Sequence, residues 1–313
     1  MEQKYAIGLD LGGTTLKYAL ISQDGTILNY GKIPSMAEVS AEAIIGQIMK
    51  AISFMTEAAG QDRAVKIAGI GIGTPGIVDN GRIIGGTENM TGWTGIDIVS
   101  IIESRTGLRA FAANDANMMG FGETLFGAGK GASDVVFLTV GTGIGGAVVT
   151  GGKLFTGYGG RGTELGHVPV LADGETCACG STGCLEHYAS ASALVRMFTE
   201  EMRAQGLPCD GADGKYIMDL CHAGDKVALK CLDRHCDLLG HGIAGFINIF
   251  SPQMVIIGGG LADAGEFYLS RVREKAFRYA MPECAAGTEI KGAALGNKAG
   301  CFGAAAMVFQ GTE

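Results

Sequence analysis

The residues with the clearest chemistry are three cysteines and a histidine. Cys177, Cys179 and Cys184 fall within eight positions, and His167 lies ten residues before the first of them. One imidazole and three thiolates complete the tetrahedral ligand set of a structural zinc, which leaves no open position for water. A disulfide between Cys177 and Cys179 would close a strained loop, and a catalytic thiol would need an activating base. The spacing favours zinc over free thiols.

Two glutamates flank this cluster. Glu164 lies three residues before His167, and Glu186 lies two residues after Cys184. A loop folded around a metal would hold both carboxylates at fixed positions, where they could bind the hydroxyl groups of a substrate. Composition alone favours the alternative, in which both are surface glutamates on a polar loop.

An asparagine and an aspartate form a second candidate site. Asn114 and Asp115 follow the strand-like segment 108–113 and precede an apolar helical stretch. A side chain at such a junction can project into a cleft. The same pattern is typical of a helix cap, and sequence alone favours that simpler interpretation.

Three glycine-rich turns follow apolar segments. In DLGGTT, Asp10 ends a strand-like segment, and the residues after it could bring backbone and hydroxyl donors to a phosphate chain and its metal. GTGIGG (141–146) matches the dinucleotide pattern GxGxxG, but β-branched residues follow it where a helix is required, so we exclude that site. No P-loop motif occurs. With GGGL (258–261), the turns indicate one nucleotide cleft, although each alone would be a simple hairpin turn.

The elements that must position these residues follow a plan that occurs twice, with strands in a hairpin meander followed by helices. A helix is expected at 40–59, with Ser40 as its N-cap and isoleucines repeating at helical spacing. We expect two α/β lobes, each with a five-stranded mixed sheet. The predicted strand segments are 5–10, 16–21, 27–33, 66–73, 134–140, 147–155 (a hairpin) and 254–260.

Composition and charge restrict the class of protein. The 313 residues, 47% of them hydrophobic, can bury a large core and fit about two domains. A net charge of −8 gives no basic surface for nucleic acid, and we find neither a targeting segment nor an apolar run of about 18 residues. We therefore expect a cytoplasmic protein with no nucleic-acid or membrane partner. Thiols stay reduced there, so we expect free thiols at Cys209, Cys221, Cys231, Cys236, Cys284 and Cys301.

Taken together, the motifs resemble a known family. DLGGTT, GTPG, NDAN, GTGIGG, ELGH followed by CACGSTGCLE, and GGGL occur in the order and spacing of ROK sugar kinases, within the actin-like ATPase superfamily. The resemblance spans Tyr5 to Met307. It implies an α/β, duplicated actin-like ATPase (ribonuclease H-like) fold with an interlobe cleft. With the duplicated plan, we expect a small lobe of residues 1–117 plus about 297–313 and a large lobe of 118–296 that carries the zinc loop.

By resemblance, the candidate residues take roles in phosphoryl transfer from ATP to a hexose. Asp115 matches the base that takes the proton from the sugar's 6-hydroxyl. The cysteine motif matches one that binds zinc in the family, and Asp10 would hold Mg²⁺ through water. The residues expected to bind the sugar are Asn89, Asn114, Asp115, Glu164, His167 and Glu186. Those expected to hold the phosphates and adenosine are Asp10, Gly12, Gly13, Thr14, Gly141, Thr142, Gly143, Gly259 and Gly260.

The resemblance implies an ATP-dependent hexokinase with glucose as the first choice of substrate. N-acetylglucosamine and N-acetylmannosamine kinases stay open as alternatives, because such sugars differ by one substituent or in stereochemistry. Some ROK proteins are sugar-responsive repressors, but the first strand begins at residue 5, which we expect to leave no room for a DNA-binding helix-turn-helix. A sugar-sensing protein without catalysis is a further alternative. The family often forms dimers or tetramers, so we expect a homo-oligomer.

Overall fold

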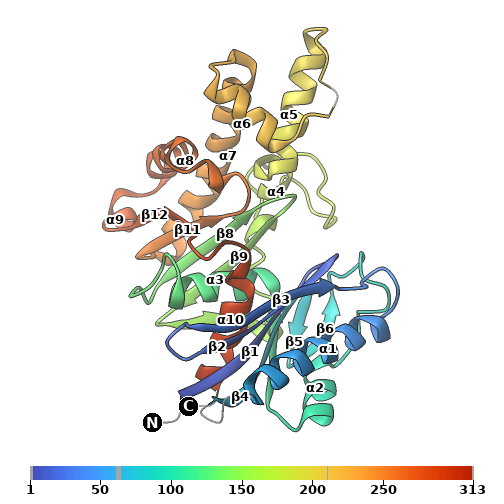
Figure 1. The fold of residues 1–313 in the computed structure, drawn as a ribbon. Coiled ribbons are helices and arrows are strands. Elements are labelled where there is room, and N and C mark those ends of the chain that lie inside the picture. The colour runs from blue at the N-terminus through green and yellow to red at the C-terminus, as the bar shows by residue number, and fades with distance from the viewer. Residues whose placement is uncertain (1–2, 61–64, 210, 312–313) are drawn as a thin grey trace.

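Two five-stranded mixed sheets organise the chain in the computed structural model, which describes residues 3–60, 65–209 and 211–311 (Figure 1). The strand order is β3-β2-β1-β4-β7 in the first sheet and β10-β9-β8-β11-β12 in the second, and β5 pairs with β6 in a separate hairpin. The strands are β1 (Gln3–Leu11), β2 (Thr15–Ser22), β3 (Ile27–Pro34), β4 (Val65–Thr74), β5 (Ile77–Asp79), β6 (Arg82–Gly85), β7 (Ala110–Asn114), β8 (Val135–Val140), β9 (Ile144–Thr150), β10 (Lys153–Phe155), β11 (Met254–Gly258) and β12 (Glu289–Gly292).

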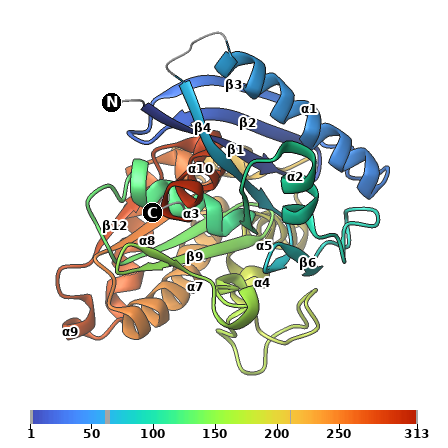
Figure 2. The ribbon, with the colours of Figure 1, turned by 90° about the horizontal axis from the view of Figure 1, so that it is seen from below.

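Helices cover both faces of each sheet (Figures 1 and 2). The α-helices are α1 (Ala41–Gly60), α2 (Ile98–Thr106), α3 (Asp115–Phe126), α4 (Leu185–Ala189), α5 (Ala191–Ala204), α6 (Gly214–His222), α7 (Lys226–Phe250), α8 (Glu266–Tyr279), α9 (Pro282–Ala285) and α10 (Ala299–Gly311). The short 3-10 turns are η1 (Tyr158–Gly160), η2 (Leu165–His167), η3 (Ala262–Ala264) and η4 (Gly296–Lys298). Helix α1 begins as predicted, because the hydroxyl of Ser40 accepts a hydrogen bond from the N–H of Ala43 at 3.1 Å.

The two sheets share one topology, which confirms the predicted duplication. In each, three strands form an antiparallel meander. A fourth strand pairs in parallel with the first strand of the meander, β1 or β8, and a fifth pairs in parallel with the fourth. One boundary differs from the prediction of a turn over 141–146. Only 141–143 turn, because Gly145 and Gly146 already pair with Thr139 and Leu138 in the ladder between β8 and β9.

Alternating residue size decides which helix packs on each face of the first sheet. In β1, Ile7 and Leu9 belong to the cluster that packs against α1, and Gly8 faces α10. A Cβ atom on Gly8 would lie 2.0 Å from the carbonyl oxygen of Cys301, and one on Gly71 of β4 would lie 1.9 Å from that of Ala304. Glycines therefore let the α10 backbone lie directly on the sheet.

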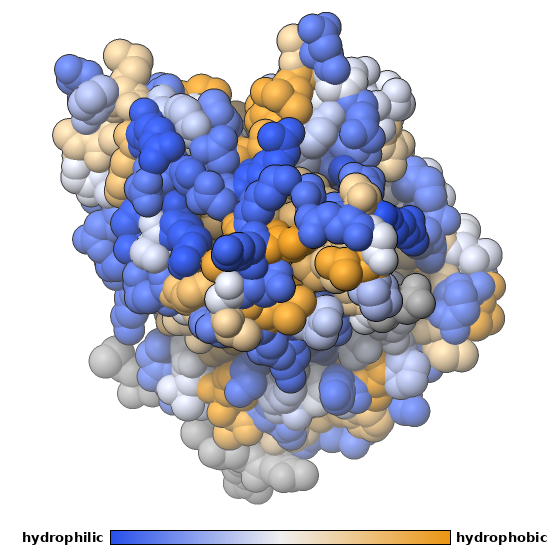
Figure 3. Space-filling view, turned by 90° about the horizontal axis from the view of Figure 1, so that it is seen from above, coloured by the Kyte–Doolittle hydropathy of each residue, from blue (hydrophilic) through white to orange (hydrophobic). Residues whose placement is uncertain are grey.

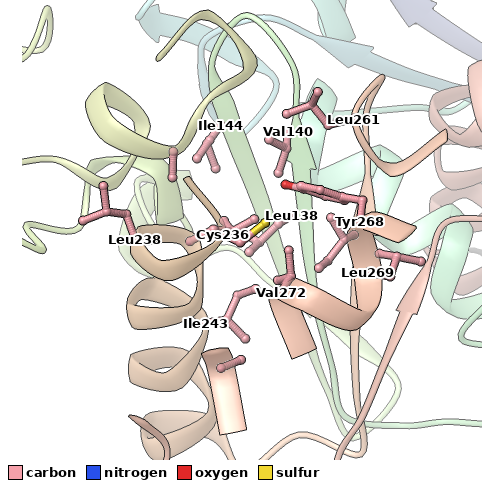
Figure 4. Packing of buried hydrophobic residues seen from close by; sticks show 14 of the residues in the cluster. Leu138, Val140, Ile144, Cys236, Leu238, Ile243, Leu261, Tyr268, Leu269 and Val272 are labelled. Atoms are coloured by element: carbon pink, nitrogen blue, oxygen red, sulfur yellow. The ribbon is translucent and has the colours of Figure 1, made fainter. Parts of the chain in front are cut away.

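The second sheet has its larger core on the side of α7 and α8. Figure 4 shows side chains of β8 packed against those of the two helices. The opposite face of the sheet packs against α3 and α10 through a separate cluster that includes Phe121, Phe137 and Ala306. The labelled members of the larger core are Leu138, Val140, Ile144, Cys236, Leu238, Ile243, Leu261, Tyr268, Leu269 and Val272.

Helices α3 and α10 lie side by side between the two sheets (Figures 1 and 2). Their backbones touch, since a Cβ atom on Gly303 would lie 1.7 Å from the carbonyl oxygen of Met118, and one on Gly122 would lie 2.3 Å from that of Ala299. This pair of helices therefore connects the two halves of the chain. Helix α10 also brings the end of the chain back to β1 and β4.

The surface carries no extended apolar band on the face shown in Figure 3, where hydrophobic residues form separate groups among hydrophilic ones. Among the helices that the structure describes, none combines the length and the apolar character needed to cross a bilayer.

Candidate active site

His167, Cys177, Cys179 and Cys184 meet at one point. The Nδ1 atom of His167 lies 3.7 Å from the Sγ atom of Cys177, and the Sγ atoms of Cys179 and Cys184 are also 3.7 Å apart. All four ligand atoms lie within 4.8 Å of one another. A tetrahedral zinc with Zn–S bonds of about 2.3 Å requires sulfur atoms about 3.8 Å apart. The donor set and its spacing therefore fit a closed structural zinc site.

A tight loop brings the cysteines together. The backbone N–H of Cys177 donates to the carbonyl of Ser181 at 2.7 Å, and Gly180 turns the chain with a φ of +87°. At Gly183, φ is +74° and a Cβ atom would lie 1.9 Å from the carbonyl oxygen of Leu171, so only glycine fits there. Cys184 then forms the N-cap of α4, which fixes the last cysteine at the start of a helix.

The two flanking glutamates have different surroundings. Glu186 lies in the first turn of α4, and its Oε2 atom accepts a hydrogen bond from the backbone N–H of Ile144 at 2.8 Å. Glu164 stays accessible to solvent, yet the protein around it displaces part of its water. This desolvation raises the pKa of Glu164; the charge of Glu186 adds to the rise, and His167 opposes it. The hydrogen bond from Ile144 therefore fixes the Glu186 side chain, whereas Glu164 is an exposed side chain near it.

At the junction of β7 and α3, the helix cap and the candidate base are different residues. Asn114 is the cap, because its Oδ1 atom accepts hydrogen bonds from the N–H groups of Ala116 (2.9 Å) and Asn117 (3.2 Å). Its Nδ2 atom donates to the carbonyl of Gly76 at 3.1 Å. Asp115 begins the helix, and among the described residues its carboxylate accepts only from local backbone N–H groups, those of Ala116 and of Asp115 itself. The side chain of Asp115 is therefore available for chemistry.

The pKa of Asp115 is strongly perturbed. Burial raises it to about 6, and the charges of Asp10 and Glu164 add to the rise, while the hydrogen bond from the N–H of Ala116 opposes it. A buried carboxyl group with a pKa shifted toward neutrality is typical of a catalytic base. The same interactions place Asp10 and Glu164, which come from two other parts of the chain, each within electrostatic reach of Asp115.

Asp10 has a partner that the sequence analysis missed. The Nζ atom of Lys17 lies 3.0 Å from the Oδ2 atom of Asp10, because these residues are direct cross-strand neighbours in β1 and β2. The predicted hairpin register could have revealed this pair. Helix α10 begins beside it, since a Cβ atom on Gly300 would lie 2.5 Å from the carboxyl carbon of Asp10. In the turn 12–14, space is open above Gly13, where a ligand could approach the backbone.

A cavity of about 540 Å³ lies beside the second and third glycine turns. It is lined on one side by Gly141 and Thr142 and on another by Gly260, three of the residues that the sequence predicts to hold the nucleotide. Its third wall is α6, which the sequence analysis did not connect with the site, although Lys215, Met218, Asp219 and His222 recur there at helical spacing. The complete lining is Gly141, Thr142, Ala191, Gly214, Lys215, Met218, Asp219, His222, Gly260, Leu261, Asp263 and Ala264.

Gly143 and Gly259 do not line this cavity, although Gly259 lines an adjoining one of about 370 Å³ that also contacts Gly260 and Asp263. Gly259 has a φ of +94°, and a Cβ atom there would lie 2.2 Å from the carbonyl oxygen of Val140. Gly143 faces protein as well, because its Cβ atom would lie 2.4 Å from the Oε2 atom of Glu186. Both positions need glycine for packing against the chain itself.

Asn89 lies exposed in the loop between β6 and α2. This loop is anchored by Trp93, which is fully buried and donates from Nε1 to the Oγ1 atom of Thr74 at 2.9 Å. Thr74 ends β4, next to the turn whose Gly76 carbonyl accepts a hydrogen bond from Asn114. The loop that carries Asn89 and the β7–α3 junction that carries Asn114 are therefore both hydrogen-bonded to the end of β4 and the turn after it.

The cysteines outside the zinc loop are free, as expected. Cys231, His235 and Cys236 lie on α7, and the Nε2 atom of His235 lies 2.8 Å from the hydroxyl of Tyr268 in the core. Within the described residues, the group around His167 is the one set of three or more potential metal ligands that come together.

Comparison with known proteins places this architecture in a family. The glucokinase of Thermotoga maritima is 40% identical over 313 residues, which cover 96% of each chain. A ROK family glucokinase from Streptomyces griseus, solved in complex with glucose and AMPPNP, is 34% identical with a TM-score of 0.80, over 98% of this chain and 99% of the other. A ROK hexokinase from Thermus thermophilus is 33% identical with a TM-score of 0.85, over 98% of both chains. The ROK family profile matches residues 6–311, and the chain belongs to the ROK family.

Proposed function

We propose that this protein is an ATP-dependent glucokinase, which transfers the γ-phosphoryl group of ATP to the 6-hydroxyl of glucose. The observation that carries the proposal is that two further carboxylates lie near Asp115. Asp10, near the end of β1, is paired with Gly73 of β4, and a Cβ atom on Gly73 would lie 3.5 Å from the Cα atom of Asp115. Thr163, next to Glu164, donates from its hydroxyl to the Oδ1 atom of Asn117 in α3 at 2.7 Å. The charges of Asp10 and Glu164 accordingly both raise the pKa of Asp115. Candidates for metal binding, proton transfer and sugar binding thus share one site. Glucose is favoured because the relatives compared above include glucokinases, one of them bound to glucose.

Asp115 serves as the base in this proposal. It accepts the proton of the 6-hydroxyl as that oxygen bonds to the γ-phosphorus and the bond from phosphorus to the departing ADP oxygen breaks. A pKa of about 6 leaves Asp115 mostly ionised at pH 7 and still basic enough to take the proton. The N-termini of α3 and α10 lie at Asp115 and beside Asp10, where their dipoles favour an anionic ligand.

The nucleotide is assigned to the three glycine turns. The phosphates contact the turn 12–14 and Gly141 and Thr142, and the adenosine fills the cavity between α6 and residues 260–264. Asp10 is the carboxylate that would hold Mg²⁺, with Lys17 beside it as a second charge for the phosphates. When bound, Mg²⁺ neutralises charge on the phosphates.

The sugar is assigned to the opposite side of the site, where Asn89, Asn114, Glu164, His167 and Glu186 supply polar groups. Zinc at His167, Cys177, Cys179 and Cys184 is structural in this proposal, because four protein ligands leave no position for a reacting water. Its role is to hold the loop that carries Glu164 and Glu186.

Three further assignments complete the proposal. The small lobe comprises residues 1–117 plus about 297–313, and the large lobe comprises 118–296. The protein acts in the cytoplasm, which agrees with its nine cysteines, none of which is in a disulfide in the described part of the chain. It assembles as a homodimer or homotetramer, as ROK proteins often do.

The experiment that tests this function is a sugar-dependent assay of ADP release with Mg-ATP. Glucose, N-acetylglucosamine, N-acetylmannosamine, mannose, fructose and allose are compared by kcat/KM. We expect glucose to give the highest value. In Asp115→Asn, loss of the base should lower kcat by about 10²- to 10⁴-fold, while the affinity for glucose changes little because the side chain keeps its size and one acceptor oxygen.

Each alternative has its own outcome. A higher kcat/KM for an N-acetylhexosamine would replace glucose as the substrate. Turnover that survives in Asp115→Asn would refute Asp115 as the base. Sugar binding without sugar-dependent ADP release by zinc-loaded protein would identify a sugar-sensing ROK protein without catalysis.

A further inference from the structure

Ile144 is the first residue of β9, immediately after the turn 141–143, and the zinc loop contacts its backbone from two sides. Its N–H donates to the Oε2 atom of Glu186 at 2.8 Å. Its carbonyl oxygen faces Gly166, where a Cβ atom would lie only 2.1 Å away. Gly166 directly precedes the zinc ligand His167, and Glu186 lies two residues after the ligand Cys184.

The turn itself is tied to the same region. The carbonyl of Gly141 accepts a hydrogen bond from the N–H of Ala191 at 2.8 Å, just after the end of α4. Gly143 lies against the Glu186 carboxylate so closely that a Cβ atom would be 2.4 Å from Oε2. The first turn of α4 and the first residue of α5 therefore hold the two ends of the turn.

We propose that Glu186 is a positioning residue for the nucleotide as well as a ligand of the sugar. One oxygen of its carboxylate fixes the backbone of the turn 141–143, and the other accepts no hydrogen bond from the described part of the chain and is left for a sugar hydroxyl. The inference rests on the proposed function and extends it. The carboxylate of Glu186 therefore serves both the proposed sugar site and the turn 141–143.

The sign of the effect distinguishes positioning from simple electrostatics. A carboxylate near anionic phosphates repels them, so an electrostatic role alone predicts tighter nucleotide binding when Glu186 is removed. A positioning role predicts weaker binding, because the N–H of Ile144 loses its charged partner and the turn loses its fixed shape. A hydrogen bond to a charged group stabilises enough to account for about a tenfold change in affinity.

The test measures the Kd of Mg-AMPPNP by calorimetry without any sugar, on variants whose zinc content is verified. We expect Glu186→Ala to raise this Kd about tenfold. Glu186→Gln keeps an acceptor for the N–H of Ile144, so its Kd for Mg-AMPPNP should be no higher than that of the native protein. The matched control is Glu164→Ala, which removes the other proposed sugar carboxylate. In the described part of the chain, no hydrogen bond joins Glu164 to the turn, so this change should not weaken nucleotide binding.

A second variant leaves Glu186 in place. In Gly143→Ala, the added methyl group must displace the Glu186 carboxylate, so the Kd for Mg-AMPPNP should rise as it does in Glu186→Ala. If both changes act through the same carboxylate, the double variant should bind little more weakly than either single variant.

Three outcomes would overturn the proposal. The first is a native nucleotide Kd in Glu186→Ala, and the second is equal weakening in Glu164→Ala. The third is additive losses from Gly143→Ala and Glu186→Ala, which would mean that the two residues act independently. None of these is confused with failure of the proposed function, which would appear as a native protein that binds Mg-AMPPNP but phosphorylates no sugar.

Discussion

The carboxyl group of Asp115 is surrounded by features that oppose its ionisation. Burial and the charges of Asp10 and Glu164 raise its pKa to about 6, against about 3.9 in an unfolded chain. The folded protein therefore holds a proton here more tightly than the unfolded chain does between about pH 4 and pH 6. Stability from this group is greatest at low pH and falls as pH rises through that range. The base needed for catalysis is thus a local source of instability at neutral pH.

We predict that Asp115→Asn stabilises the protein at pH 8. A shift of about two pKa units corresponds to roughly 3 kcal/mol, and the neutral amide avoids this cost while it can still accept the N–H of Ala116. Near pH 4, where Asp115 is largely protonated in the folded protein, the variant and the native protein should have similar free energies of unfolding. Urea denaturation at both pH values measures the difference.

The control for this effect is Asp173→Asn, at an exposed aspartate. Its free energy of unfolding should differ from the native value by a similar small amount at both pH values. If Asp115→Asn were destabilising at pH 8, the desolvation of Asp115 would not be the dominant influence on its ionisation.

At the level of elements, glycine governs how close α10 comes to the first sheet. A methyl group on Gly71 would lie 1.9 Å from the carbonyl oxygen of Ala304, and both backbones are held by other contacts. We predict that Gly71→Ala lowers the free energy of unfolding by about 3 kcal/mol or more, because overpacking against backbone cannot be relieved by a rotamer change. Guanidinium denaturation followed by circular dichroism measures the loss.

The matched control is Gly46→Ala in α1. Gly46 is exposed within the helix, and nothing lies within 4 Å of the position that a Cβ atom would take. Alanine is a better helix former than glycine, so this change should stabilise the protein by about 0.5–1 kcal/mol. A similar loss in both variants would mean that the Gly71 effect does not come from contact with α10.

The same glycines explain what the sequence could and could not predict about the fold. The alternation of glycine and isoleucine in 69–73 predicts the buried strand at 66–73, because the pattern is local. It does not reveal that the glycine face touches α10, since the chain positions of Gly71 and Ala304 are far apart. Hairpin meanders and α1 were predictable for the same local reason, while the junction of α3 with α10 depends on the closed tertiary structure.

The candidate site likewise has parts that the sequence could predict and parts that it could not. The zinc ligands lie within one short stretch, so residue type and spacing predicted the cluster that the structure assembles. The wall of the cavity formed by α6 was missed, because Met218 and His222 have the same spacing as ordinary core residues. The tie between Glu186 and Ile144 also joins segments that are distant in sequence. No local pattern marks such a contact.

For the whole molecule, the important feature is the helix pair between the sheets. Helix α10 packs on β1 and β4 of the first sheet, α3 packs on β8 and β9 of the second, and the two helices contact each other through their backbones at Gly303 and Gly122. Loss of either sheet would expose part of this shared core. The two halves of the chain should therefore unfold together.

The chain offers a probe for each half. Trp93 is the single tryptophan, and it is buried in the core of the first sheet, where its indole donates to Thr74. Far-ultraviolet circular dichroism mainly follows helices, of which α4 to α9 all pack around the second sheet or beyond it (Figure 1). We predict coincident denaturant midpoints by tryptophan fluorescence and by circular dichroism. Separate midpoints would mean that the α3–α10 contact is too weak to couple the halves, and that each sheet with its outer helices is stable alone.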